Sequence, residues 1–405
     1  MDDKTLTCDV LIVGGGPAGL SVASTLPDDV RTVLVHQDHE IGLPVRTSGG
    51  CWMQDVERLG IPADMYIRIN TSEAFADDAQ TRIPMGDAVP VILDTPKLYK
   101  WLAQQSDQKD RTLLLGTKFL STRQRDDGLY ESTIRARDTA YDCVVSKYIV
   151  DGSGWQFAVL DSLGLAQKPE RLAVGTEYEY PLGENAPDRA IIFVGDKVPA
   201  GYGWVFSTGR DTLRIGVGVI QPDTDESPRD LLDAVIKDKP YLERLGLKLD
   251  GEPVVHSGIL PSVAYDDRLV FGNVVRVGDS ANFATPTMGE GIRICIELGS
   301  LLGEQLGKAV KTGQRGPLET YERLCRDKLK RDYKWGFLVN TRAAKYTRDK
   351  WNASVRRMGR VEPEVIVATL RGEFPIVKIA RMAWEMVRRR IYARVIKLKS
   401  RLGLA

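Results

Sequence analysis

A short stretch near the N-terminus, residues 8–26, constrains the fold more than any other part of the sequence. It begins with a short apolar run over residues 8–13, interrupted only by Asp9 and containing β-branched side chains, which suits a buried strand and is too short for a helix. Three glycines follow in the spacing G-x-G-x-x-G, and a helix of small residues begins within this motif. Such a turn lets the backbone approach a pyrophosphate, which the free N–H groups of the helix N-terminus then bind. The residues that we expect to hold the phosphates are Gly14, Gly16, Pro17, Ala18 and Gly19.

The second predicted strand, residues 31–36, ends in an unusual residue for a dinucleotide-binding fold. An acidic residue generally ends this strand and binds the ribose hydroxyls. Here His36 stands at that place, followed by Gln37 and Asp38. Because a neutral imidazole also forms hydrogen bonds with hydroxyls, we expect His36 to contact the cofactor, with an exposed residue at a strand end as the alternative.

The composition argues against several classes of protein. At 405 residues the chain fits about two or three lobes, and its net charge of +1 gives no reason to expect nucleic acid as a partner. Five widely spaced cysteines and three histidines indicate neither a disulfide framework nor a metal site. The sequence shows no signal peptide and no run of about 18 apolar residues, so we expect a cytoplasmic protein without a spanning helix.

A Gly/Ser/Pro-rich loop, residues 40–52, holds one arginine and one cysteine. This loop resembles the segment after the second strand in flavoproteins of the p-hydroxybenzoate hydroxylase type, most closely the geranylgeranyl reductases. The resemblance implies that Arg46 contacts the phosphate or ribitol part of the flavin cofactor and that Gly50 lies near the flavin ring. A surface salt bridge is the alternative for Arg46. Cys51 is either a reactive thiol beside the flavin or a small buried apolar residue, which is the commoner fate of a free cysteine.

A strand that ends in Asp151-Gly152 resembles the Asp-Gly motif of the same flavoproteins. The resemblance implies that Asp151 helps to organise the cofactor region, while a role as helix N-cap or turn residue is the alternative. Trp155-Gln156 stand where an arginine often follows this motif, which weakens the case for nicotinamide docking.

A second glycine motif lies far downstream, where a predicted strand ends in Gly278-Asp279 and a long predicted helix opens after Gly-Glu-Gly. A carboxylate at a strand end can accept hydrogen bonds from ribitol hydroxyls. The N–H groups at the helix start can face the flavin edge on which negative charge builds up during reduction. The motif resembles the second flavin motif of the same family, and the two motifs together account for both ends of a long cofactor. We therefore expect FAD rather than NAD, held at this end by Asp279, Gly289, Gly291 and Ile292.

Three aromatic residues alternate along one predicted strand, so their rings lie on one face of it: Tyr202, Trp204 and Phe206. Such a wall suits a flat apolar or polyene substrate beside a flavin. The segment resembles the Tyr-x-Trp-x-Phe-Pro motif of geranylgeranyl reductases, with Ser207 in place of the proline. We expect these rings to line the substrate cavity, and an aromatic stripe in the core is the alternative.

The last part of the chain is basic: residues 341–405 hold 17 Lys and Arg against 5 Asp and Glu. Residues 375–402 combine a helical spacing of apolar residues with lysines and arginines on the remaining turns. A basic amphipathic helix is typical of peripheral membrane contact, and the alternative is a helix that packs on its own protein.

These features together predict an α/β fold. We expect an FAD-binding Rossmann-like domain of the glutathione-reductase/p-hydroxybenzoate-hydroxylase type, an inserted antiparallel β-sheet substrate domain and a helical C-terminal region. The predicted segments interleave along the chain. The FAD-binding domain takes residues 1–75, 95–160 and 265–315, the substrate domain 76–94 and 161–264, and the basic helical region 316–405.

The resemblance implies an FAD-dependent reductase of isoprenoid double bonds of the geranylgeranyl type, acting on a prenyl-chain lipid or diphosphate. Hydride would pass from N5 of reduced flavin to one alkene carbon and a proton to the other, and no residue stands out as the proton donor. Since the sequence has no second G-x-G-x-x-G, either NADPH binds a surface groove or a ferredoxin-like protein supplies electrons. The alternatives are a flavin-dependent monooxygenase or halogenase, an enzyme like lycopene cyclase, and a non-catalytic flavin-binding protein.

Overall fold

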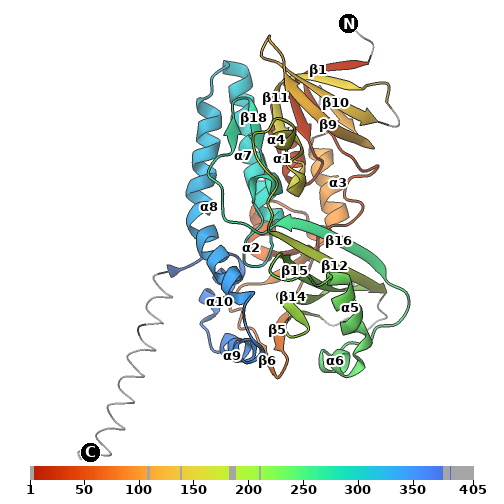
Figure 1. The fold of residues 1–405 in the computed structure, drawn as a ribbon, viewed down its shortest axis with the longest axis vertical. Helices are drawn as coiled ribbons and strands as arrows, with labels where there is room; N and C mark the ends of the chain where they lie inside the picture. Colours follow the sequence, from red (N-terminus) through yellow and green to blue (C-terminus); the bar gives the residue numbers. More distant parts are fainter. Residues whose placement is uncertain are drawn as a thin grey trace, which may run out of the picture.

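A computed structural model describes residues 4–106, 110–136, 139–181, 188–208, 211–376 and 384. In these ranges the chain forms two large sheets, one small sheet and a set of helices that lie between and beside them (Figure 1).

The first large sheet has eight strands and a parallel centre in the order β18-β11-β1-β2-β8. In β1, residues 10–13 are buried because their side chains alternate between two hydrophobic clusters, one on each face of the sheet. This burial on both faces explains why the strand reads as a continuous apolar run. The strands are β1 (Thr5–Val13), β2 (Thr32–Val35), β8 (Arg111–Leu114), β9 (Thr117–Gln124), β10 (Tyr130–Ala136), β11 (Cys143–Asp151), β17 (Val270–Phe271) and β18 (Val274–Arg276).

Two helices that begin at the two predicted cofactor motifs cross in direct contact: α1 (Pro17–Thr25) and α7 (Ile292–Thr312). Glycines at every fourth position of α7 permit this approach. A Cβ atom at Gly299 would lie 2.6 Å from the carbonyl oxygen of Ala18, and one at Gly303 would lie 2.6 Å from that of Val22. The two helices therefore meet backbone to backbone, which fixes how far apart their N-termini lie.

The second large sheet has seven strands in the order β16-β12-β15-β14-β13-β5-β6. Its outer face packs on α5 (Pro228–Lys237) and α6 (Lys239–Arg244), and its inner face turns toward the first sheet (Figure 1). The strands are β5 (Thr71–Ala76), β6 (Ala79–Arg82), β12 (Leu172–Pro181), β13 (Arg189–Gly195), β14 (Val198–Ser207), β15 (Thr212–Gln221) and β16 (Val254–Pro261). Strand β5 pairs with β13 from Thr71 onward, so the sheet begins before the predicted border at residue 76.

A small third sheet joins β3 (Gly50–Trp52), β4 (Tyr66–Arg68) and β7 (Pro90–Leu93). Because β7 pairs with β3 and β4, the end of the segment 76–94 does not belong to the seven-stranded sheet. Helix α2 (Met53–Arg58) packs on β3, α4 (Ala158–Ser162) packs on β9 and β11 of the first large sheet, and the longer α3 (Thr95–Gln105) packs on α1. Helix α3 begins after Asp94, whose side chain accepts a hydrogen bond from the N–H of Lys97.

The C-terminal region is helical as predicted, in its described part. Helix α8 (Gly316–Ala343) packs along α7, α9 (Arg348–Met358) packs on β5 and β6, and α10 (Pro363–Leu370) follows. None of the described helices combines the length and the apolarity needed to cross a bilayer. The predicted basic helix over 375–402 lies, apart from 375, 376 and 384, outside the described residues.

Candidate active site

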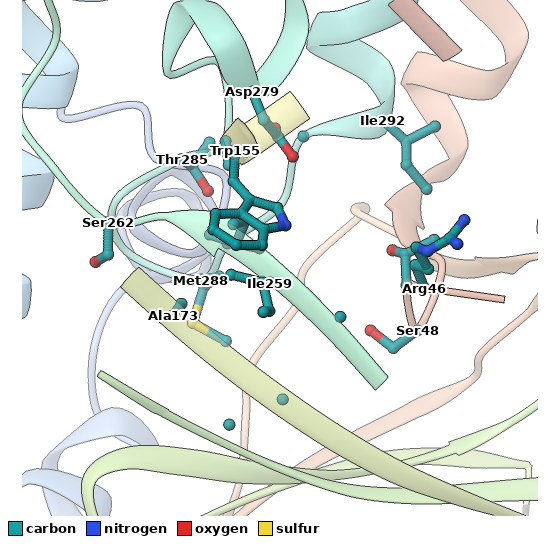
Figure 2. A pocket seen from close by; sticks show the side chains of 18 of the residues that line it. Arg46, Ser48, Trp155, Ala173, Ile259, Ser262, Asp279, Thr285, Met288 and Ile292 are labelled. Atoms are coloured by element: carbon teal, nitrogen blue, oxygen red, sulfur yellow. The ribbon is translucent and has the colours of Figure 1, made fainter. Parts of the chain in front are cut away.

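One large cavity of about 710 Å³ lies between the carboxyl ends of the parallel strands and the inner face of the seven-stranded sheet. This size falls in the range typical of small-molecule sites. Most of its lining comes from the first glycine motif, the loop after β2, the segment 152–158 after β11, strands β12–β16, the second glycine motif, and helices α8–α10. Figure 2 shows several of its side chains, with Asp279 and Trp155 pointing into the open space.

The first glycine motif forms one end of the cavity. Gly14 has a φ of +113°, and a Cβ there would lie 2.1 Å from the carbonyl oxygen of Gly152. A Cβ at Gly19 would lie 2.0 Å from the carbonyl oxygen of Gly14, so strand and helix pack closely. At Gly16 a Cβ would meet no protein atom within 4 Å, and Gly16, Pro17 and Ala18 line the cavity. The N-terminus of α1, which no side chain caps, therefore leaves room and N–H donors for a pyrophosphate.

A polar group beside this motif joins His36 to a carboxylate that the sequence argument passed over. The Nδ1 atom of His36 accepts a hydrogen bond from the N–H of Gly15 at 3.1 Å, so its Nε2–H faces Asp38 at 3.4 Å. Burial lowers the pKa of His36, which favours this neutral form. Arg46 donates to both carboxylate oxygens of Asp38, at 2.6 and 3.0 Å. Arg46 thus makes the salt bridge given as its alternative, and it also lines the cavity. The sequence could have indicated Asp38, because it is an acidic residue two positions beyond the end of the predicted strand 31–36.

The second glycine motif closes the cavity from the other side. Gly278 packs on the first motif, since a Cβ there would lie 2.9 Å from the Cβ of Ala18. Asp279 lines the cavity, and burial raises its pKa to about 6. Among the described residues no donor forms a hydrogen bond with this carboxylate, so its oxygens are available to a ligand. Helix α7 begins at Ile292 without a side-chain cap, and its first N–H groups also lie at the cavity wall, together with Gly289 and Gly291.

These features fit FAD. Two helix N-termini with open donors converge on one cavity, fixed by the contact between α1 and α7, and a carboxylate without a described partner lies beside them. The first donor set suits a pyrophosphate, and the second suits the ribitol and the flavin edge.

A buried ionic cluster ties the second motif to the C-terminal region. Arg293 donates to Glu290 at 2.8 Å and to the carbonyl oxygen of Arg371 at 2.7 Å. Arg371 donates in turn to Asp55 of α2. Burial alone would raise the pKa of Asp55, but the hydrogen bond from Arg371 and the charge of Arg293 hold it below its ordinary value. The cluster is therefore a set of mutually compensated charges beneath the cofactor motif.

Asp151 and Cys51 both lie off the cavity wall. The Asp151 carboxylate is fully buried and accepts hydrogen bonds from Ser153 and from the N–H groups of Val159 and Leu160 at the start of α4. This contact matches the capping alternative, while the neighbouring Gly152 lines the cavity. Cys51 is buried, and burial raises the pKa of its thiol far above the ordinary value, which matches the buried apolar alternative.

The predicted aromatic wall is only partly present. Tyr202 and Trp204 line the cavity with their ring centroids 5.8 Å apart, and the Tyr202 hydroxyl donates to the carbonyl oxygen of Met288 at 2.5 Å. Phe206 instead packs beneath β3 and β7, where a Cβ at Gly50 would lie 3.8 Å from its ring. Phe206 and Gly50 are thus neighbours of each other outside the residues that line the cavity. Alternation placed all three rings on one face correctly, but the cavity ends before the strand does.

The Trp204 indole lies across glycines of the adjacent strand. A Cβ at Gly216 would lie 2.3 Å from its ring and one at Gly218 would lie 3.2 Å away, so larger residues at these two positions would displace it. Its Nε1–H donates to Glu177 at 2.9 Å. Glu177 is 3% exposed and pairs across the sheet with His256, and both line the cavity. Neither residue was predicted from the sequence; the available signal for Glu177 was a pair of glutamates, with Glu179, in a strand otherwise rich in apolar and aromatic residues.

The far end of the cavity is apolar. It is formed by the seven-stranded sheet and by helices that the sequence argument did not place at the site. The apolar residues that line this end are Ala74, Ile83, Ile192, Val194, Val355, Met358, Ile366 and Leu370. The cavity therefore runs from polar cofactor motifs to an apolar chamber completed by α9 and α10.

Comparisons with known proteins agree with this geometry. Residues 7–333 match the family described as FAD binding domain. The chain is 25% identical to digeranylgeranylglycerophospholipid reductase 3 of Methanosphaera stadtmanae, over 75% of this chain and 78% of that protein. A solved geranylgeranyl bacteriochlorophyll reductase-like protein from Thermoplasma acidophilum has a TM-score of 0.78 at 20% identity, covering 92% of this chain and 98% of the other. A probable FAD-dependent monooxygenase from Pseudomonas aeruginosa has a TM-score of 0.62 at 16% identity, covering 86% and 99%.

The two solved structures show the shared fold, and the family match extends over most of the chain. The predicted fold class and the predicted cofactor are thereby confirmed. With two glycine motifs that meet on one cavity, this chain belongs to the FAD-binding domain family and is an FAD-dependent oxidoreductase.

Proposed function

We propose that the protein reduces carbon–carbon double bonds of a prenyl-chain lipid. One observation carries the proposal: the cavity that both FAD motifs line continues without interruption into the apolar chamber under α9 and α10. Transfer of a long apolar chain from water into such a chamber is favourable, because its apolar surface is removed from water. The curated relatives named digeranylgeranylglycerophospholipid reductase support a prenyl-lipid substrate rather than a small polar one.

The residues of the chain have separable tasks in this reaction. Reduced FAD, when bound, supplies a hydride to one alkene carbon. Tyr202 and Trp204 hold the chain against the cavity floor, and the chamber excludes water from it. The electrons reach the protein from NADPH at a surface groove or from a ferredoxin-like donor.

Glu177 is the group that we assign to proton delivery at the other alkene carbon. Its Oε2 accepts the Trp204 Nε1–H, whereas its buried Oε1 forms no hydrogen bond with a described residue and lies 3.7 Å from Nε of Arg214. Burial raises the pKa of this carboxyl, despite the charge of Arg214, and so favours the protonated form. His256 pairs with Glu177 across the sheet, lines the cavity and contacts Glu179 through Nε2 at 2.9 Å, and we assign to it the return of a proton after each turnover.

Anaerobic turnover tests the proposal. The purified protein is reduced with dithionite under nitrogen and incubated with a geranylgeranyl glycerolipid, and the products are analysed by mass spectrometry. We expect two hydrogens to be added per double bond reduced. A product that forms only with oxygen and contains it would identify a monooxygenase, an isomer of unchanged mass a cyclase, and no product a binding protein. Each of these outcomes contradicts the proposal.

A cavity variant and an acid variant sharpen the test. Met358→Trp should fill part of the chamber and abolish reduction of the lipid while the protein keeps its yellow flavin absorbance. Glu177→Gln should slow reduction more than tenfold with little change in lipid affinity, because a general acid contributes at least about 100-fold in typical cases.

A further inference from the structure

The cavity reaches the surface at the end of α8 and along strand β16, because apolar residues of both segments line the cavity and are exposed to solvent. Of the four large apolar residues that line the cavity and are also exposed to solvent, three belong to this part of the molecule: Val339 of α8, Tyr346 just after it, and Ile259 of β16. The fourth, Leu43, lies in the loop after β2. Arg171 holds the two elements together, because it donates to Ser262 after β16 and to Asn340 of α8.

Four large apolar residues at the end of α8 and just after it are exposed to solvent. Trp335, Leu338, Val339 and Tyr346 are 41%, 37%, 42% and 36% exposed, and their spacing along the chain places the first three on one side of α8. Singly exposed apolar residues need no explanation, but a contiguous group marks an interaction site. Tyr346 stacks edge-on with Trp351 at 5.1 Å, and both rings line the cavity. We call the four exposed residues the α8 rim.

Basic side chains flank the α8 rim. Lys334, Arg342 and Lys345 are exposed, and no described acidic residue forms an ion pair with any of them. Elsewhere on the same helix, Lys328 and Lys330 form ion pairs with Glu297 and Asp267. Uncompensated cations beside exposed aromatic and aliphatic residues suit a surface that is anionic outside and apolar within.

We propose that the α8 rim docks on an anionic lipid bilayer and that the cavity opens into the bilayer there. A water-soluble partner does not explain why the exposed apolar residues continue into the cavity wall at Val339 and Tyr346, whereas a bilayer does. The prenyl chain then enters between α8 and β16 without crossing water. The identity of the molecule that enters rests on the proposed function; the docking itself does not.

Vesicle flotation with the full-length protein tests the docking without turnover. We expect binding to vesicles of phosphatidylcholine with one third phosphatidylglycerol, and much weaker binding to phosphatidylcholine alone. Each basic residue near an anionic surface strengthens binding about fivefold, so the triple variant Lys334→Gln, Arg342→Gln, Lys345→Gln should bind on the order of 100-fold more weakly. The double variant Trp335→Gln, Leu338→Gln removes rim residues that do not line the cavity and should also release the protein.

A matched control removes exposed leucines from another part of the surface. Leu113 and Leu120, on β8 and β9, are 39% and 43% exposed, and Leu113→Gln with Leu120→Gln should leave vesicle binding unchanged. In vesicles that contain brominated lipid, tryptophan quenching should fall on changing Trp335→Phe, because this ring enters the bilayer.

Three results would overturn the proposal. The rim variants could bind vesicles as well as the unaltered protein, or the control variant could lose binding equally. The protein could also form a dimer that the rim variants dissociate, which would show that the α8 rim covers a second copy of the chain. Failure here is distinguishable from failure of the proposed function. Rim variants should still reduce detergent-solubilised lipid, whereas an enzyme with another activity would still float with vesicles.

Discussion

The carboxylate of Asp279, which accepts no hydrogen bond from a described residue, leads to a prediction with opposite signs for protein stability and for cofactor binding. Burial raises its pKa from 3.8 to about 6, so the ionised form destabilises the cofactor-free protein at neutral pH. One pKa unit corresponds to about 1.4 kcal/mol, which gives about 3 kcal/mol as the full cost. Because the side chain is partly accessible to water in the cavity, we expect Asp279→Asn to raise the free energy of unfolding by about 1–3 kcal/mol.

The pH dependence of this gain follows from the same carboxyl group. Below about pH 4 Asp279 is protonated in both the folded and the unfolded chain, so the variant has no advantage there. The destabilisation by ionised Asp279 develops as pH rises from about 4 to 6 and is constant above that range. The stabilisation by Asp279→Asn at pH 5 should therefore be about half that at pH 7.5. Urea unfolding of the deflavinated protein measures it. Glu304→Gln, on the exposed side of α7, is the control and should change nothing.

Cofactor affinity should change in the opposite direction. The ribitol hydroxyls donate to a carboxylate more strongly than to a neutral amide, so Asp279→Asn should weaken FAD binding about tenfold or more. Quenching of flavin fluorescence during titration of the deflavinated protein measures this loss. A variant that is less stable than the unaltered protein without FAD, or that binds FAD equally well, would refute the reasoning.

Three further substitutions or titrations test other parts of the site. A methyl group in Gly216→Ala should displace the Trp204 ring, lower the free energy of unfolding by about 1–3 kcal/mol and change tryptophan fluorescence; an unchanged spectrum would contradict the packing. Asp55→Asn removes the buried carboxylate that pairs with both Arg371 and Arg293 and should cost about 3–5 kcal/mol in urea unfolding, whereas Asp64→Asn, which breaks an exposed pair, should cost less than about 1 kcal/mol; equal losses would contradict the buried cluster. Since burial lowers its pKa, His36 should titrate below 6.5 in a proton NMR experiment on the cofactor-free protein, and FAD binding should weaken as pH falls through that value; a higher pKa would contradict the neutral tautomer.

The sequence was informative wherever a function needs a fixed local spacing. The predicted strand over residues 8–13 and the predicted helix from Ile292 are both present in the structure, because glycine turns and apolar periodicity are local properties. The same motifs predicted FAD correctly. Their side chains and backbone groups act within a few residues of the turns that position them.

What could not be predicted depends on contacts between distant segments. Phe206 shares a strand face with Trp204, yet only the position of β3 decides that its ring lies under Gly50 instead of in the cavity. Similarly, α9 and α10 complete the apolar chamber because α9 packs on β5 and β6, and no local pattern in the helices encodes that contact. For the same reason, the sequence did not indicate that β5 pairs with β13, more than a hundred residues away, and that the seven-stranded sheet therefore begins before residue 76.

The glycines of α7 have a consequence for cofactor choice that reaches beyond packing. Gly299 and Gly303 contact α1 without lining the cavity themselves, yet they determine the separation of the two helix ends that lie at it. A Cβ on either residue would lie 2.6 Å from a carbonyl oxygen of the opposing backbone, which cannot rotate aside. The absence of a side chain at these two positions thus sets the distance between the two helix N-termini, and with it the length of the dinucleotide that the protein can bind.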